Sequence, residues 1–100
     1  MAGFIQIMDI QTSRIDEVEA LARQMADERA EAFLARRSTV TADRDKPGHY
    51  FIVVEFDSYE DAMENSADPV TSRYAEKMTT LLDRPPVFYN LDVHDVLEVG

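Results

Sequence analysis

The segment HYFIVVEFD, residues 49–57, is apolar on both faces of a predicted strand. Because successive side chains of a strand point to opposite sides, Phe51 and Val53 share one face and the even-numbered apolar residues share the other. The even-numbered set is Tyr50, Ile52, Val54 and Phe56. A chain of 100 residues has too few helices to cover both faces of a sheet. We therefore expect a second copy of the chain to cover one of them.

Hydrophobic periodicity predicts the remaining elements. Residues 4–10, FIQIMDI, form a short isoleucine-rich run typical of a buried strand, and apolar residues then recur at helical spacing from Arg14 to Ala32. Residues 34–41 are β-branched or polar, as in a strand at a sheet edge, and the Asp-, Pro- and Gly-containing segment ADRDKPGH joins them to the next strand as a hairpin. Residues 87–96 predict a final strand.

Helix-start signals mark the other helices. Ser13 and Ser58 each stand three residues before an aspartate, which is a capping-box arrangement. The helix that opens at Ser58 fades near residues 65 and 66, and Asp68 followed by Pro69 restarts it, because proline lacks the N–H that would be unsatisfied at that position. Arg84 and the two prolines after it end this helix.

The predicted order is strand, helix, strand, strand, helix, strand, with the second helix interrupted. This order is that of the ferredoxin-like βαββαβ fold, an α+β arrangement with a four-stranded antiparallel sheet. Its connections place the first and third strands at the sheet centre. We expect residues 1–100 to form a single domain.

Charge and composition narrow the possible partners. Twenty acidic and ten basic residues give a net charge of −10, which would repel a nucleic acid backbone or an anionic membrane. No apolar run approaches the ~20 residues of a membrane span. The N-terminus shows no secretory leader, so we expect a cytoplasmic protein. The absence of cysteine excludes disulfides, thiolate metal sites and a cysteine nucleophile.

Two segments resemble a known family, the dimeric α+β barrel proteins and, among them, the antibiotic biosynthesis monooxygenase type. They are FDSYEDAMENSADPV at residues 56–70 and TTLLDRPPVFYNLDV at residues 79–93. The resemblance implies that two sheets pack face to face across a two-fold axis, and that each subunit holds a pocket between its sheet and helices. Some members are cofactor-free oxygenases of aromatic polyketides or quinols.

This chain departs from the family pattern at several site positions. Phe56 stands where many of these oxygenases have tryptophan, and Asn65 and Val70 stand where they have histidines. Members that degrade haem use an asparagine on the first strand, together with a tryptophan and a helix histidine. Here Gln6 occupies that strand and the other two are missing, which argues against haem degradation.

The candidate catalytic residues are Gln6, Asn65, Tyr74 and His49. Gln6 interrupts an apolar strand, so it either contacts a ligand or is an amide satisfied inside the fold. Asn65 either points into the pocket or caps a helix. His49 either acts as a distant general base or is an exposed histidine at a strand end. We expect no metal site, since His49 and His94 would need a third converging ligand.

Aromatic and methionine side chains could line a pocket for a flat aromatic ligand, or could belong to an ordinary core. They are Tyr50, Tyr74, Tyr89, Phe33, Phe51, Phe88, Met8, Met63 and Met78. Two functions remain open. One is a homodimeric, cofactor-independent monooxygenase that acts on an aromatic or quinol-like small molecule, with no bound cofactor. The alternative is a non-catalytic dimer that binds a small hydrophobic ligand or serves as an accessory subunit.

Overall fold

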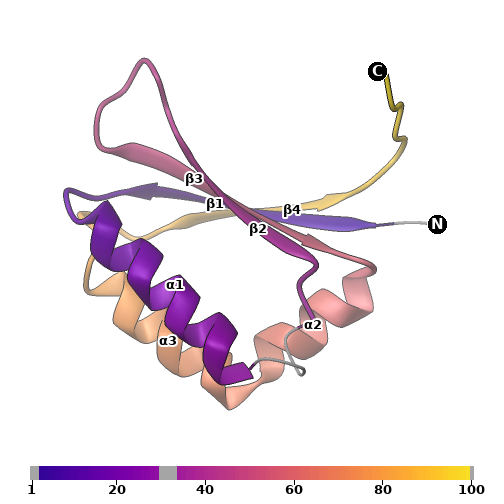
Figure 1. Ribbon diagram of the computed structural model, residues 1–100, viewed down its shortest axis with the longest axis horizontal. Coiled ribbons are helices and arrows are strands. Elements are labelled where there is room, and N and C mark those ends of the chain that lie inside the picture. The colour runs from indigo at the N-terminus through magenta and orange to yellow at the C-terminus, as the bar shows by residue number, and fades with distance from the viewer. Residues whose placement is uncertain (1–2, 30–33, 100) are drawn as a thin grey trace.

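The computed structural model describes residues 3–29 and 34–99, and its elements follow the predicted order (Figure 1). Four antiparallel strands form one sheet in the order β2-β3-β1-β4, so the first and third strands lie at its centre. The ferredoxin-like prediction is therefore confirmed. The elements are β1 (Phe4–Gln11), α1 (Ile15–Arg29), β2 (Arg37–Ala42), β3 (His49–Phe56), α2 (Tyr59–Ala67), α3 (Pro69–Thr79) and β4 (Val87–Asp92).

The second and last strands are shorter than predicted. β2 begins at Arg37 rather than at residue 34, and Arg37 pairs with Glu55, one residue before β3 ends. β4 ends at Asp92, which pairs with Phe4, the first residue of β1. Just before β2, the Arg36 N–H donates a backbone hydrogen bond to the Glu55 carbonyl at 2.7 Å. Beyond β4, Val93 donates one backbone hydrogen bond to Gly3.

The predicted signals at the starts of α2 and α3 are confirmed. Ser58 Oγ accepts a hydrogen bond from the Asp61 N–H, and Asp68 Oδ1 accepts one from the Val70 N–H at the start of α3, where Pro69 is the first residue. The break between the two helices leaves Asn65 buried beside it.

The start of α1 differs from the prediction. Here Thr12, not Ser13, accepts a hydrogen bond from a backbone N–H, that of Arg14, and the helix begins at Ile15. The expected end of this helix, near Ala32, lies outside the described residues.

All three helices lie on one side of the sheet (Figure 1). Two buried clusters hold them there: Phe4 and Phe56 pack with Ala62, and Ile10 and Ile52 pack with Val18. On β1, residues 6 and 8 face the helices between these two clusters and are only half-buried. This gap in the core is where the site described below lies.

The other side of the sheet has no helix over it. We call its apolar part the open face, and its residues are Ile5, Ile7, Phe51, Val53, Val87, Tyr89 and Leu91. On β4 these side chains remain 40–45% exposed. Figure 1 also shows the chain after β4 leaving the sheet on this side. Among the residues that the structure describes, no helix is long and apolar enough to cross a membrane.

Candidate ligand-binding cavity

A cavity of about 930 Å³ lies between the sheet and the helices α1 and α3. Its volume is within the range of about 300–1,000 Å³ that is typical of ligand pockets. The strands contribute the residues of their helix-covered face, and the helices contribute their inward stripes. The lining includes Gln6, Met8, Leu21, Met25, Val40, Ile52, Val54, Asn65, Ser66, Thr71, Tyr74, Met78, Phe88 and Asn90.

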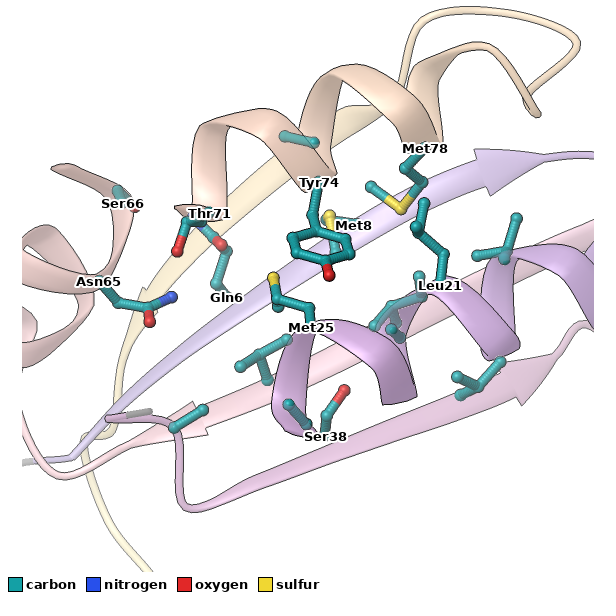
Figure 2. Close-up of a pocket in the computed structure, with 18 of the residues that line it drawn as sticks. Gln6, Met8, Leu21, Met25, Ser38, Asn65, Ser66, Thr71, Tyr74 and Met78 are labelled. Atoms are coloured by element: carbon teal, nitrogen blue, oxygen red, sulfur yellow. The ribbon is translucent and has the colours of Figure 1, made fainter. Parts of the chain in front are cut away.

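One part of the cavity is apolar. Figure 2 shows Met8 of β1, Met25 of α1 and Met78 of α3 grouped around the ring of Tyr74, with Leu21 beside them. Thioether side chains have several rotatable bonds and contact aromatic rings favourably, so they adapt to flat ligands. This part of the cavity suits the apolar body of a small molecule.

Neutral polar side chains gather in another part of the cavity, near the break between α2 and α3. We call this set the polar end: Gln6, Asn65, Ser66, Thr71 and Asn90. Gln6 and Asn90 are opposite each other on β1 and β4, and Gln6 Nε2 donates a hydrogen bond to Asn90 Oδ1 at 3.0 Å. Asn65 is 8% exposed, and Figure 2 shows its amide directed into the cavity. Each primary amide carries two donors and an acceptor, so this end can bind a carbonyl or hydroxyl group.

The charged residues that line the cavity are not among the residues of the polar end; they are Glu19, Arg23, Arg36 and Arg37. Arg36 forms an ion pair with Asp57, at 3.2 Å, and Arg37 forms one with Glu55, at 2.8 Å. Both arginine side chains are mostly exposed, which is typical of a solvated rim rather than a binding group. Among the described residues, the polar end itself is therefore uncharged.

Tyr74 contributes its ring to the cavity but directs its hydroxyl to α1. The residue is 6% exposed, and its Oη donates a hydrogen bond to Glu28 Oε2 at 2.5 Å. Arg73 Nη2 lies 3.5 Å from Glu28 Oε1. The hydrogen bond to Glu28 raises the pKa of Tyr74, and burial and the charge of Glu28 act in the same direction. Tyr74 is thus a hydrogen-bond donor held by α1 rather than a base.

We expect the free energy of unfolding to fall more steeply at alkaline pH in the wild type than in Tyr74→Phe. The pKa of Tyr74 is raised in the folded chain, so the folded state holds this proton more tightly than the unfolded state. That stabilisation is complete below the ordinary tyrosine value of about 10 and is lost as the pH rises through the folded-state value. Urea unfolding at about pH 7 and about pH 11 measures how far the free energy of unfolding falls in each protein. An equal fall in the wild type and in Tyr74→Phe would contradict the prediction.

His49 lies on the opposite side of the sheet from the cavity. Its Nε2 bonds with Asp9 Oδ1, and its Nδ1 lies 3.4 Å from a carboxylate oxygen of Asp43. Arg84 Nη2 lies 3.6 Å from the same Asp9 oxygen. These groups pair at the end of the sheet where β1, the β2–β3 hairpin and the segment before β4 meet, so His49 does not reach the cavity. His94 lies exposed after β4.

The structure brings three of the four candidate catalytic residues together. Gln6, Asn65 and Tyr74 line one cavity, and His49 does not. Sequence reasoning missed Asn90 and Met25 as lining residues. Asn90 was recognisable only as a polar residue on the last strand, because its position opposite Gln6 depends on strand register. Of the proposed aromatic and methionine lining, Tyr74, Phe88, Met8 and Met78 contribute; Tyr50, Phe51, Tyr89 and Met63 do not, and Phe33 lies outside the described residues.

Residues 3–29 and 34–99 contain no group of three or more histidine, aspartate or glutamate side chains arranged to hold a metal ion. The features that remain for a ligand are an apolar enclosure and a set of neutral hydrogen-bonding groups. Together with the fold, they define a small ferredoxin-like α+β protein with a cavity under its helices.

No family model and no curated protein sequence matches the chain. Solved structures match it over nearly its whole length. A candidate antibiotic biosynthesis monooxygenase from Bordetella bronchiseptica has a TM-score of 0.77 at 16% identity, covering 97% of this chain and 100% of that chain. A protein from Mycobacterium tuberculosis has a TM-score of 0.71 at 20% identity, covering 98% and 99%. SnoaB from Streptomyces nogalater, a cofactor-independent oxygenase solved as an asparagine-to-alanine variant, has a TM-score of 0.71 at 14% identity, covering 98% and 96%.

At these identities the likeness shows a shared fold. The chain therefore has the fold of the antibiotic biosynthesis monooxygenase structures, and the predicted resemblance is confirmed at that level.

Proposed function

We propose that this protein is a homodimeric, cofactor-independent monooxygenase that oxidises an aromatic or quinol-like small molecule. The observation that carries the proposal is the cavity of about 930 Å³, which combines an apolar part with a neutral polar end. The fold shared with SnoaB, a cofactor-independent oxygenase, supports the same reaction class. The aromatic body would pack beside the Tyr74 ring, in contact with Met8, Met25 and Met78, and its oxygen would meet the amides.

In this reaction the substrate itself supplies the electrons. A ring carbon activated by a neighbouring phenolate or enolate adds to O₂, and the resulting peroxide loses water. One oxygen atom remains on the substrate as a carbonyl or hydroxyl group, and the other leaves in water with two substrate hydrogens. The chain's own groups orient the substrate and stabilise its oxyanion with hydrogen-bond donors that are already in place.

Gln6, Asn90 and Asn65 are the donors we assign to that oxyanion. Because the described polar end holds no carboxylate or imidazole, the substrate proton passes to water rather than to a side chain. The rate should then rise with pH through the pKa of the substrate, and changing the substrate should move the profile.

The dimer forms, in this proposal, through the open face. On β4, the side chains of the open face are 40–45% exposed: Val87, Tyr89 and Leu91. In the segment after β4, Val96 and Leu97 are more exposed still. A contiguous apolar surface of this kind is typical of an interaction site. The open face is self-complementary in chemistry, as an isologous contact across a two-fold axis requires.

Oxygen uptake tests the enzymatic function. Purified protein in buffer with a metal chelator is given anthrone or 1,4-dihydroxynaphthalene, and O₂ consumption is followed with an electrode. We expect consumption above the protein-free rate, with one O₂ used per product formed. Uptake equal to the protein-free control for both compounds, together with a rise in melting temperature when the redox-stable 1-naphthol is added, would instead indicate the non-catalytic ligand-binding alternative.

A further inference from the structure

We propose that the hydrogen bond between Tyr74 and Glu28 is a latch that controls access to the cavity, and that α1 and α3 separate at this end to admit a ligand. The inference rests on the proposed function in one respect, namely that the cavity is where the ligand binds. It assigns to Tyr74 and Glu28 a role in entry and exit rather than in chemistry.

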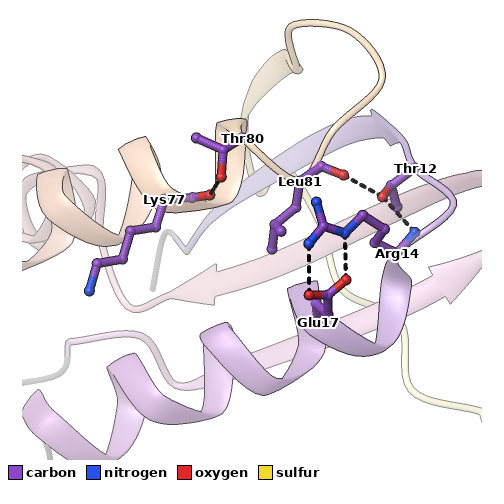
Figure 3. Close-up of polar contacts among 6 residues, drawn as sticks. All are labelled: Thr12, Arg14, Glu17, Lys77, Thr80 and Leu81. Carbon is purple, nitrogen blue, oxygen red and sulfur yellow. Dashed lines mark hydrogen bonds and ion pairs between the residues drawn. The ribbon is translucent and has the colours of Figure 1, made fainter.

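The opposite end of the helix pair is firmly tied. Thr12, at the start of the connection to α1, is 1% exposed. Its Oγ1 donates a hydrogen bond to the Leu81 carbonyl just after α3, at 2.6 Å, and accepts one from the Arg14 N–H, at 2.9 Å (Figure 3). The Asp83 N–H also donates to the Gln11 carbonyl at 2.8 Å. Breaking this arrangement would leave buried polar groups unsatisfied, which is costly. This end can serve as a hinge.

The latch end has a different character. The two helices run antiparallel, so the last turns of α1 lie beside the first turns of α3 (Figure 1). There Glu28 accepts the Tyr74 hydroxyl and lies 3.5 Å from Arg73. The side chains of Glu28 and Arg73 are 42% and 63% exposed, so water can replace their contacts when the helices part. The carboxylate and the guanidinium at this end therefore remain hydrated when the bond opens, unlike the buried groups next to Thr12.

Tyr74 also has the right position for a gate. Its ring lies between Met25 of α1 and Met78 of α3 (Figure 2). Its hydroxyl donates a hydrogen bond to the partly exposed carboxylate of Glu28. Tyr74 therefore connects the cavity lining to a partly exposed side chain of α1. The raised pKa of Tyr74 keeps its donor hydrogen in place at neutral pH. When the bond breaks, the ring is free to swing out of the wall.

Ligand exchange kinetics test the latch. Stopped-flow fluorescence with the neutral probe N-phenyl-1-naphthylamine measures association and dissociation rates in the wild type, Tyr74→Phe and Glu28→Gln. We expect both rates to rise about tenfold in Tyr74→Phe, which loses a hydrogen bond to a charged acceptor, and by a smaller factor in Glu28→Gln, whose amide oxygen accepts the same bond without the charge. The dissociation constant should change by less than about twofold, because opening affects entry and exit equally. Two controls should leave both rates unchanged: Tyr59→Phe, at an exposed tyrosine, and Glu17→Gln, which breaks the exposed Arg14–Glu17 pair at the hinge end.

Unchanged rates in both variants would overturn the latch. So would a rise in the dissociation rate alone with a matching loss of affinity, since that pattern means that Tyr74 contacts the ligand directly. Amide hydrogen exchange on the ligand-free protein gives a second readout. We expect faster exchange in the last turns of α1 and the first turns of α3 in Glu28→Gln than in the wild type, with no change next to Thr12. A change in exchange rate that is the same at both ends of the helix pair would contradict the latch. If the probe does not bind the wild type, the proposed ligand site fails, and the exchange result still decides the latch.

Discussion

Val53→Asp is expected to convert the proposed dimer into folded monomers at micromolar concentration. Val53 lies on the central strand β3, opposite Ile7 of β1 and Thr39 of β2, in the middle of the open face. A carboxylate there would be buried without a partner in each copy when two sheets meet, at a cost of about 3–5 kcal/mol. The dissociation constant should therefore rise by at least about 100-fold.

Sedimentation velocity of both proteins measures this change, and circular dichroism confirms that the variant is folded. Ala20→Asp, at an exposed position of α1, introduces the same charge away from the open face and should leave the dimer intact. A wild-type protein that sediments as a monomer, or a Val53→Asp variant that remains dimeric, would remove the open face as the contact surface.

Gln6→Met is expected to lower kcat/KM for oxygenation by about 100-fold, because loss of one preorganised donor to a developing oxyanion typically costs this much. Methionine keeps the length of the side chain and removes only its hydrogen-bonding groups. Its effect should fall mainly on kcat, since the oxyanion develops in the transition state. Loss of the Gln6 donor also frees Asn90 Oδ1, so the two residues act as one unit.

Oxygen uptake with anthrone at several concentrations separates kcat from KM in this variant. Gln24→Met, on the exposed side of α1, is the matched control and should retain the wild-type rate. The melting temperature of each variant shows whether the fold is retained. An unchanged kcat in folded Gln6→Met would exclude Gln6 from the chemistry and leave it as a structural amide.

The order of elements was predictable because each pattern has a local cause. Alternating and helical spacing of apolar residues identified the strands and helices, and Ser58 and the Asp68–Pro69 pair located two helix starts through bonds made within a few residues. Strand ends were not predictable in this way. Asp92, the last residue of β4, pairs with Phe4, the first residue of β1, and this register cannot be read from the residues of β4 alone.

Site residues could be predicted where a polar side chain interrupts an apolar strand or stands at a break in a helix. Gln6 is polar in an apolar strand and Asn65 stands at a helix break, and both line the cavity. Asn90 was missed because a polar residue on an edge strand is unremarkable until its partner is known. His49 could not be placed because its side chain faces away from the helices, and its partners Asp9 and Asp43 come from two separate segments.

Tyr74 illustrates a further limit. Helical spacing placed its ring among inward-facing residues, and the ring does line the cavity. The direction of its hydroxyl depends on how α1 crosses α3. This crossing places Glu28 Oε2 at 2.5 Å from the Tyr74 Oη, although the two residues are 46 positions apart in the chain. Tyr74, a candidate catalytic residue, is therefore a hydrogen-bond donor that links α3 to α1.

A crystal structure of the protein with bound 1-naphthol tests the central claim most directly. We expect the naphthalene rings to pack beside the Tyr74 ring, in contact with Met8, Met25 or Met78, with the hydroxyl oxygen within hydrogen-bond distance of Gln6, Asn65 or Asn90. A ligand bound only outside this cavity, or a cavity filled by its own side chains, would contradict the account.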